Sequence, residues 1–164
     1  MRLGNENADI DAIDVKLLRL LEKDARTSIA ELARSVGLSA PSVAERIRRL
    51  QESGVIEAYT VRISSTALGL PLSAWLRIRP VPGQLATVAE IIRGLPEIAL
   101  CDRVTGEDCF IALAHVGSVA ELERLIDRII PYAMTNTAII QSSPVTARSP
   151  LKAALRALGH DAER

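Results

Sequence analysis

One short segment, residues 27–59, constrains the fold of this chain more than any other stretch of its sequence. Apolar residues in the first part of the segment recur with the i, i+3, i+4, i+7 spacing of one buried helical face. They are Ile29, Leu32, Ala33 and Val36. Gly37 follows directly and permits a sharp turn. The pattern predicts a short amphipathic helix that ends at a glycine turn.

A second short helix follows the turn. Ser39 can cap it with its hydroxyl group, and Pro41 suits its first turn. Its apolar positions repeat with helical spacing at Val43, Ile47 and Leu50, whereas its outer face is polar and rich in arginine. Two short helices joined in this way are typical of a helix-turn-helix that reads double-stranded DNA.

The residues that we expect to contact DNA are Arg34, Ser39, Ser42, Arg46, Arg48 and Arg49. Small residues at a helix start allow close approach to base edges, and arginine can bind guanine edges or phosphates. We expect Ser42, Arg46 and Arg49 to read bases. Arg34 and Arg48 are expected to hold phosphates. The alternative is an amphipathic helical hairpin that only packs, but the small residues at the start of the second helix favour recognition.

The charge of the chain is balanced. Its 20 Lys and Arg residues match 20 Asp and Glu residues, and 17 of the basic residues are arginine. No overall basic field attracts nucleic acid, so DNA binding must depend on where individual arginines lie and on several copies acting together. The few aromatic residues do not interleave with a basic patch, which argues against binding to RNA or single strands.

Other features of the sequence are typical of a cytoplasmic protein. The longest apolar runs are far shorter than a membrane span, and the first residues lack the character of a signal peptide. Cys101 and Cys109 are too few for a disulfide framework, and no cysteine or histidine cluster has the spacing of a zinc site. We therefore expect free thiols, a cytoplasmic location, no cofactor and no metal.

The second half of the chain has a different period. Leu72, Ala74, Leu76 and Ile78 alternate with other residues, as in a strand with one buried face. The patterns that follow predict a helix at 84–93, strands at 98–104 and 109–116, a helix between 118 and 131, and a last strand at 137–142. This order of elements predicts an α+β fold whose second part is a ferredoxin-like βαββαβ domain.

The predicted elements divide the chain into five parts. We expect a disordered N-terminus (1–8), a helix-turn-helix DNA-binding domain (9–60), a linker strand (61–71), an effector-binding and oligomerisation domain (72–146) and a C-terminal tail (147–164). A strand at 55–63 should close the helical domain and run out of it. The tail has apolar residues at helical spacing, which fits either a short docked helix or a frayed end.

The strand at 109–116 is apolar on both faces. The two predicted helices can cover only one face of a four-stranded sheet, so the other face must meet another surface. A second copy of the same chain is the simplest partner. We therefore expect a homodimer that forms through the uncovered face.

The turn Thr105–Asp108 is the sharpest candidate for a small-molecule site. Gly106 permits a left-handed or close backbone geometry, and the carboxylates of Glu107 and Asp108 can bind an α-amino group. The same residue types are ordinary in β-hairpins, so a plain turn is the alternative.

Two further groups of polar residues fit structural roles. A further helix is expected from Asp11 to about Asp24, before the two described above. Asp14, Asp24 and Arg26 are placed to form an ion pair and a cap around this helix and the one that begins near Ile29. His115 lies on a predicted strand, where we expect a satisfied buried or interface residue rather than a ligand. Neither group is expected to act in catalysis.

Short motifs lie in a fixed order between about residue 9 and about residue 146. They are Asp11-Ala-Ile-Asp14, Asp24-Ala-Arg26, Gly54-Val-Ile-x-x-Tyr59, Leu68-Gly69, Leu95-Pro96, Val104-Thr-Gly106 and Thr135-x-Thr137. In this order and spacing the chain resembles the Lrp/AsnC family of transcription regulators. The resemblance implies a second domain that responds to amino acids. It also implies assembly into dimers and higher oligomers, usually octamers of four dimers.

The resemblance also implies where an effector binds. The family places it where such turns meet between dimers, near the last strand, which here gives Val104, Thr105, Gly106, Glu107, Asp108, Thr135 and Thr137. The chain departs from the common family pattern Gly-x-x-Asp, because Cys109 stands where that aspartate would be. Glu107 and Asp108 are the carboxylates that can take its place.

Two other functions fit the same architecture. Some haem-biosynthesis decarboxylases resemble this family and keep a degenerate helix-turn-helix beside a βαββαβ unit. This chain has only two histidines and an intact-looking recognition helix, which argues against such an enzyme. A ligand-sensing module that has lost DNA binding is the other alternative, and the balanced charge fits it. We expect a DNA-binding regulator and not an enzyme.

Overall fold

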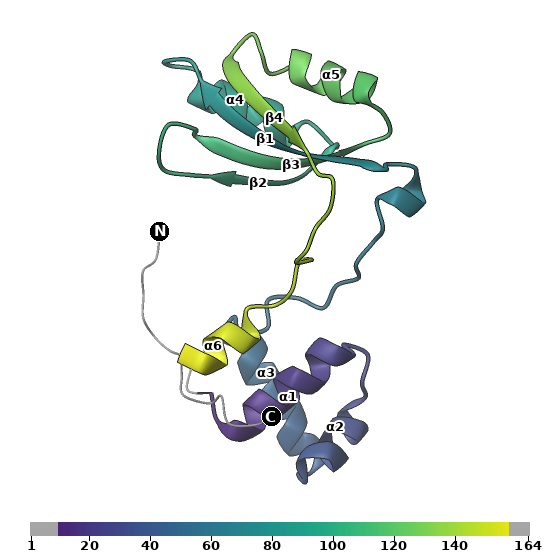
Figure 1. Cartoon of the computed structure of the whole chain (residues 1–164). Helices are drawn as coiled ribbons and strands as arrows, with labels where there is room; N and C mark the ends of the chain where they lie inside the picture. The colour runs from purple at the N-terminus through teal and green to yellow at the C-terminus, as the bar shows by residue number, and fades with distance from the viewer. Residues whose placement is uncertain (1–9, 158–164) are drawn as a thin grey trace. The chain divides into compact units, whose positions relative to one another are not determined.

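The computed structural model describes residues 10–157, which divide into two compact units (Figure 1). The first unit contains residues 10–61 together with 147–157, and the second contains 62–146. The architecture is the α+β fold expected from the sequence, with a helix-turn-helix unit and a four-stranded α/β unit. Residues 1–8, which we expect to be disordered, lie outside the described residues, as does the last part of the tail.

Three helices form the body of the first unit: α1 (Ala12–Lys23), α2 (Ile29–Val36) and α3 (Ala40–Glu52). Each starts at a capping side chain, because Asp11, Ser28 and Ser39 accept hydrogen bonds from amides in the first turn. Gly37 ends α2 in the left-handed conformation at φ 74°, which glycine adopts without strain. The turn between α2 and α3 therefore depends on the residue type that the sequence provides there.

The three helices close around a small apolar core formed by Leu17, Leu21, Leu32, Ala33, Val43 and Ile47. Burial of one large apolar side chain contributes about 1.5–3 kcal/mol, so even a core of this size holds three short helices together. Because Val43, Ile47 and Leu50 are buried, the opposite face of α3 is exposed.

The segment after α3 contains no strand, which corrects the expectation of one at 55–63. A strand needs a neighbour that completes its backbone hydrogen bonds, and none of the described residues forms a ladder with this segment. Ile56 packs against the helical core, whereas Val61 is 78% and Ile63 is 70% exposed.

The C-terminal tail forms a short helix, α6 (Leu151–Ala157), that belongs to the first unit. Leu155 is buried, with only 4% of its surface exposed. Ala154 lines the same groove as Leu18 and Leu21 of α1. Of the two expectations for the tail, the docked helix is the one observed.

The second unit is a four-stranded antiparallel sheet with two helices. Its elements are β1 (Leu72–Pro80), α4 (Leu85–Arg93), β2 (Ile98–Arg103), β3 (Phe110–Val116), α5 (Val119–Asp127) and β4 (Ala133–Ile139), preceded by a 3-10 turn at Thr66–Leu68. The order across the sheet is β2-β3-β1-β4. This is the ferredoxin-like arrangement predicted from the order of elements.

The last strand begins at Ala133, earlier than the expected range of 137–142. Its bounds are set by pairing with β1, since Pro80 lies opposite Ala133 and Ala74 lies opposite Ile139. The amide of Val81 also donates a hydrogen bond of 3.0 Å to the Tyr132 carbonyl. This bond joins the segment after β1 to the residue just before β4. Periodicity alone misplaced the strand because its side chains alternate poorly.

Both helices of the second unit cover the same face of the sheet (Figure 1). On that face, Leu76 and Ile78 of β1 are buried beneath α4 and α5. The opposite face, called here the open face, carries Trp75, which is 39% exposed, and Leu100, which is 46% exposed. As the sequence predicted, a single chain leaves one apolar face of the sheet uncovered.

Candidate functional site

The outer face of α3 carries the side chains expected to meet DNA. Ser42 is exposed near the start of the helix, and its hydroxyl oxygen lies 2.8 Å from that of Ser39. Ser39 also caps the helix, because its hydroxyl accepts a 3.3 Å hydrogen bond from the Ser42 amide. No acidic residue lies in the first turn of α3, in contrast to Asp14 in α1 and Glu31 in α2. The positive end of the α3 dipole is therefore not neutralised by its own side chains.

Two of the expected base-reading arginines form ion pairs with α1. Arg46 Nη1 lies 2.9 Å from Asp14 Oδ1 and 2.7 Å from Asp11 Oδ2, and Arg49 Nη2 lies 2.7 Å from Asp14 Oδ2. The Asp14 side chain is completely buried, whereas Arg49 is half exposed. We call Asp11, Asp14, Arg46 and Arg49 the α1–α3 ion-pair network.

This network corrects the structural role expected for Asp14. Its partners are on α3, and Arg26 does not pair with it. The amide of Arg26 instead donates a 2.8 Å hydrogen bond to Asp24 Oδ1. Asp14 does take part in the expected capping, because its Oδ2 accepts a 3.3 Å hydrogen bond from the Asp11 amide at the start of α1. Only the expected ion pair has other partners. The sequence signal for the network was the arginine pair of α3, which we had assigned to DNA alone.

The pKa values of Asp11 and Arg46 are both shifted toward the charged form. Burial alone would raise the pKa of Asp11, but hydrogen bonds from the Asp14 amide and the Arg46 guanidinium hold that pKa below its ordinary value. Hydrogen bonds to Asp14 and Asp11 raise the pKa of Arg46 further. Asp11 and Arg46 therefore remain ionised at neutral pH.

The other two arginines of the helix-turn-helix differ in their surroundings. Arg48 pairs along its own helix with Glu45 and Glu52, and hydrogen bonds to these carboxylates raise its pKa. Arg34 is exposed, and its Nε donates a long 3.4 Å hydrogen bond to the carbonyl of Ala30. Arg34 thus has most of its donors available, whereas Arg48 would have to exchange its carboxylate partners for phosphates. A DNA-binding role for each of the six residues stays a prediction.

The hairpin between β2 and β3 holds the residues expected to bind an effector. It is closed by a 2.9 Å hydrogen bond from the Val104 amide to the Cys109 carbonyl, and Thr105 is exposed in it. Gly106 has φ 107°, a conformation that other residues rarely adopt. The hairpin geometry therefore depends on Gly106.

Both carboxylates of this hairpin already have partners on β1. Asp108 Oδ2 accepts a 2.6 Å hydrogen bond from Arg77, and Glu107 pairs with Arg79. Sequence analysis missed these two arginines, although the alternation of β1 places both on the open face beside the hairpin. An ammonium group bound here would share each carboxylate with a guanidinium.

Thr135 and Thr137 lie on β4 at the same end of the sheet as the hairpin. Thr135 is opposite Ile78 of β1, and Ile78 is opposite Phe110 of β3, so β1 separates the threonines from the hairpin. Two strand spacings amount to about 10 Å. Within one chain, the threonines and the hairpin therefore do not form one pocket.

His115 lies on the open face, where its Nδ1 is 2.7 Å from the hydroxyl oxygen of Ser73. This contact fits the satisfied residue expected there. Cys101 and Cys109 are free, and burial raises the pKa of the Cys101 thiol, which favours its unreactive protonated form.

Two further observations concern residues 10–157 alone. None of their helices is long and apolar enough to cross a membrane. They contain no group of three or more His, Cys, Asp or Glu side chains arranged to hold a metal ion.

Two family models match the chain. An AsnC-type helix-turn-helix domain matches residues 10–51, and an Lrp/AsnC ligand binding domain matches residues 73–150. The two matches correspond to the helical part and the sheet-containing part described above.

Curated relatives agree with these matches. The chain is 35% identical over 133 residues to the HTH-type transcriptional regulator LrpC of Bacillus subtilis, covering 81% of this chain and 92% of the relative. It is 37% identical over 132 residues to the HTH-type transcriptional regulator LrpA of Mycobacterium tuberculosis, covering 80% and 88%. Both relatives are named as transcriptional regulators.

Solved structures show the same likeness. The structure of B. subtilis LrpC matches with a TM-score of 0.80 at 34% identity, covering 85% of this chain and all of that one. A feast or famine regulatory protein from M. tuberculosis, complexed with L-methionine, matches with a TM-score of 0.77 at 35% identity, covering 85% and 97%.

Proposed function

We propose that this chain, which belongs to the Lrp/AsnC family of transcription regulators, binds the major groove of double-stranded DNA through α3. The observation that carries the proposal is the start of α3. Its first turn holds Ala40, Pro41 and Ser42 and no acidic residue. Backbone amides there can therefore approach a phosphate or a base edge closely, with the helix dipole favouring the negative group.

The α1–α3 ion-pair network supports a second element of the proposal. Arg46 and Arg49 each use one terminal nitrogen to bind Asp14, and a guanidinium has five N–H donors. The remaining donors can contact guanine edges or phosphates, and Asp14 holds both side chains in a fixed orientation before DNA arrives. Such preorganisation lowers the entropy that binding would otherwise cost. In this proposal Ser42, Arg46 and Arg49 read bases, and Arg34 and Arg48 hold phosphates.

We further propose that the chain acts as a homodimer, because the charge of one chain offers little attraction to DNA. The open face of the sheet supplies an apolar surface with Trp75 and Leu100 exposed. The exposed side chains of Val61 and Ile63 add apolar surface that a second copy could cover. Two recognition helices related by a two-fold axis would contact an imperfect palindrome with half-sites about 34 Å apart.

An amino acid bound at the hairpin is the proposed effector. Thr135 lies about 10 Å from Phe110 across β1, and Thr137 lies two residues further along β4. They would complete the site only if a second copy brought its own threonines or hairpin close. Binding at such a contact shifts the assembly whenever one assembly binds the ligand better than another. The complex of a similar regulator with L-methionine supports an amino acid as the ligand class.

The DNA-binding proposal is tested by fluorescence anisotropy on the DNA upstream of the protein's own gene. The assay uses two salt concentrations, because phosphate contacts make affinity fall steeply with salt. We expect Arg49→Ala and Arg46→Ala each to weaken specific binding by about 1–3 kcal/mol. Arg93→Ala, which removes an exposed arginine of α4, is the matched control.

Far-UV circular dichroism of each variant checks that the helices persist, since both arginines also contact Asp14. Folded Arg46→Ala and Arg49→Ala proteins that bind like the wild type would show that α3 is not the reader. Addition of L-methionine then tests the effector, with a change in DNA affinity or assembly mass as the expected result.

A further inference from the structure

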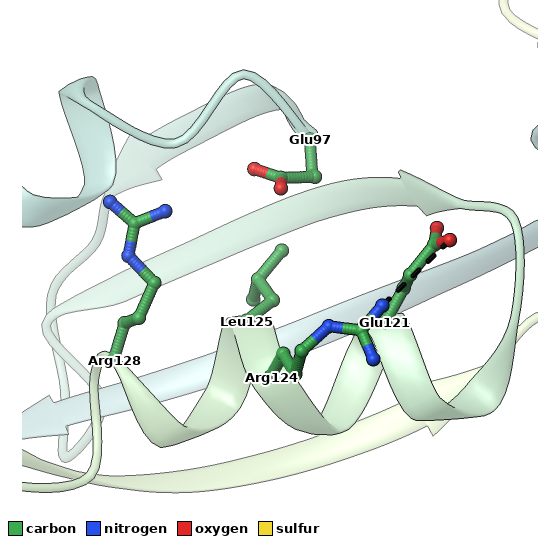
Figure 2. A pocket seen from close by; sticks show the side chains of 5 residues that line it. All are labelled: Glu97, Glu121, Arg124, Leu125 and Arg128. Carbon is green, nitrogen blue, oxygen red and sulfur yellow. Dashed lines mark ion pairs between the residues drawn. The ribbon is translucent and has the colours of Figure 1, made fainter.

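A small polar cavity lies at the end of the sheet opposite the effector hairpin. Its volume is about 350 Å³, and its lining consists of Glu97, Glu121, Arg124, Leu125 and Arg128 (Figure 2). Glu97 precedes β2, whose first residue lies opposite Ala114, whereas the hairpin follows Arg103 at the other end of the strand. The cavity is therefore separate from the hairpin within each chain.

Glu97 brings an unsatisfied polar atom to this cavity. Its Oε2 is buried and has no hydrogen-bond partner among the described residues. Buried side-chain oxygens are nearly always hydrogen-bonded, and leaving one without a donor costs free energy. In Figure 2 the Glu97 carboxylate extends into the space above α5. A donor group placed in the cavity would satisfy it.

The two arginines of the cavity, Arg124 and Arg128, have hydrogen-bond donors without acceptors in residues 10–157. Within the described residues, no carboxylate lies within ion-pair distance of Arg128. Arg124 has one contact of this kind, with Glu121 at 3.9 Å, and Glu121 Oε2 is already bound by the Gly117 amide at 2.7 Å. Both guanidinium groups therefore retain several N–H donors for an anionic group.

We infer that this cavity binds a small zwitterion with one ammonium and one carboxylate group, such as a free amino acid. The ammonium would donate to Glu97, the carboxylate would bind Arg128 and Arg124, and an apolar side chain would contact Leu125. Two glutamates and two arginines give the lining no net charge. A simple anion would be repelled by Glu97 and a simple cation by the arginines, so only a ligand with both charges matches both groups.

The size of the cavity limits the ligand further. Ligand pockets span roughly 300–1,000 Å³, so 350 Å³ is at the small end and fits a metabolite of amino-acid size. The inference rests on residues of the cavity itself and needs neither DNA binding nor the hairpin site. It adds a second amino-acid site to the one in the proposed function.

The test is isothermal titration calorimetry of the full chain with L-methionine and L-alanine. N-acetyl-L-methionine lacks the ammonium group, and L-methionine amide lacks the carboxylate. We expect the unmodified amino acids to bind, and each derivative to bind about tenfold more weakly or not at all, because each loses a charge-assisted contact.

Variants then assign the binding to the cavity. Glu97→Gln and Arg128→Gln should each weaken binding at least about tenfold. Glu123→Gln on α5 and Arg93→Gln on α4 are matched controls outside the cavity and should bind like the wild type. DNA anisotropy on the same samples reports DNA binding separately, and Asp108→Asn titrated in parallel reports the proposed hairpin site. Weaker amino-acid binding in Glu97→Gln and Arg128→Gln, but not in Asp108→Asn, therefore concerns the cavity.

Two results would overturn the inference. No heat with either amino acid would show that the cavity does not bind a free amino acid. Binding lost in Asp108→Asn but kept in Glu97→Gln and Arg128→Gln would place the ligand at the hairpin instead.

Discussion

Replacing Asp14 with asparagine should destabilise the helix-turn-helix unit strongly, although the two side chains have nearly the same shape. Asp14 is fully buried and accepts charge-assisted hydrogen bonds of 2.9 Å from Arg46 and 2.7 Å from Arg49. Each such bond contributes about 1.5–3 kcal/mol, which gives an upper range of about 3–6 kcal/mol for the pair.

Part of the stabilisation lost with the two hydrogen bonds is offset in the variant. The arginine side chains are 25% and 54% exposed, so water can solvate the guanidinium groups once the carboxylate is gone. Asparagine also keeps one acceptor oxygen. We therefore expect Asp14→Asn to lower the free energy of unfolding by about 2–4 kcal/mol, slightly less than the 3–5 kcal/mol typical of a broken buried pair.

Hydrogen exchange read by mass spectrometry localises this effect. Peptides from α1, α2 and α3 should exchange about a hundredfold faster in Asp14→Asn, because roughly 3 kcal/mol corresponds to about two powers of ten in the opening equilibrium. Peptides from β1 and β3 should not change. Glu45→Gln is the control, since it removes one carboxylate that is 63% exposed and pairs with Arg48. An exposed pair of this kind contributes little to stability, because water screens it.

Equal exchange rates in Asp14→Asn and Glu45→Gln would refute the reasoning. They would show that the buried carboxylate is not what holds α1 against α3. The apolar core formed by residues such as Leu17 and Leu32 would then suffice without it.

Two other predictions concern pH and assembly. Because the pKa of Asp11 is lowered in the folded chain, its contribution to stability is present above about pH 4 and lost as the pH falls through the folded pKa. Urea midpoints measured at pH 6 and pH 3 should therefore fall more for the wild type than for Asp11→Asn, which keeps the helix cap; equal falls would contradict this. Trp75→Glu places a charge on the open face and should lower the assembly mass measured by sedimentation, whereas Val119→Glu on α5 should not. An unchanged mass for Trp75→Glu would exclude the open face as the dimer surface.

Helical periodicity and capping residues predicted the first unit closely. Ser39 and Gly37 act locally, so their effect on helix bounds can be read from neighbouring residues alone. The same holds for β1, where strict alternation of buried side chains marks the strand.

Interactions between distant residues were harder to predict. The prediction of a strand at 55–63 was wrong because a strand depends on a pairing partner, and no described residue of this chain supplies one. The bounds of β4 depend on its register with β1 rather than on its own alternation. Arg49 looked like a free base reader because Asp14, its partner, lies 35 residues away along the sequence.

The place of α6 has a consequence for synthesis on the ribosome. The helix-turn-helix unit is discontinuous, since Leu155 completes it only after the whole sheet-containing unit has been translated. Because α6 packs against α1 from the far end of the sequence, this contact raises the contact order of the unit. A higher contact order slows the last folding step. The three helices that precede the sheet in the sequence are thus completed only after the sheet has been translated.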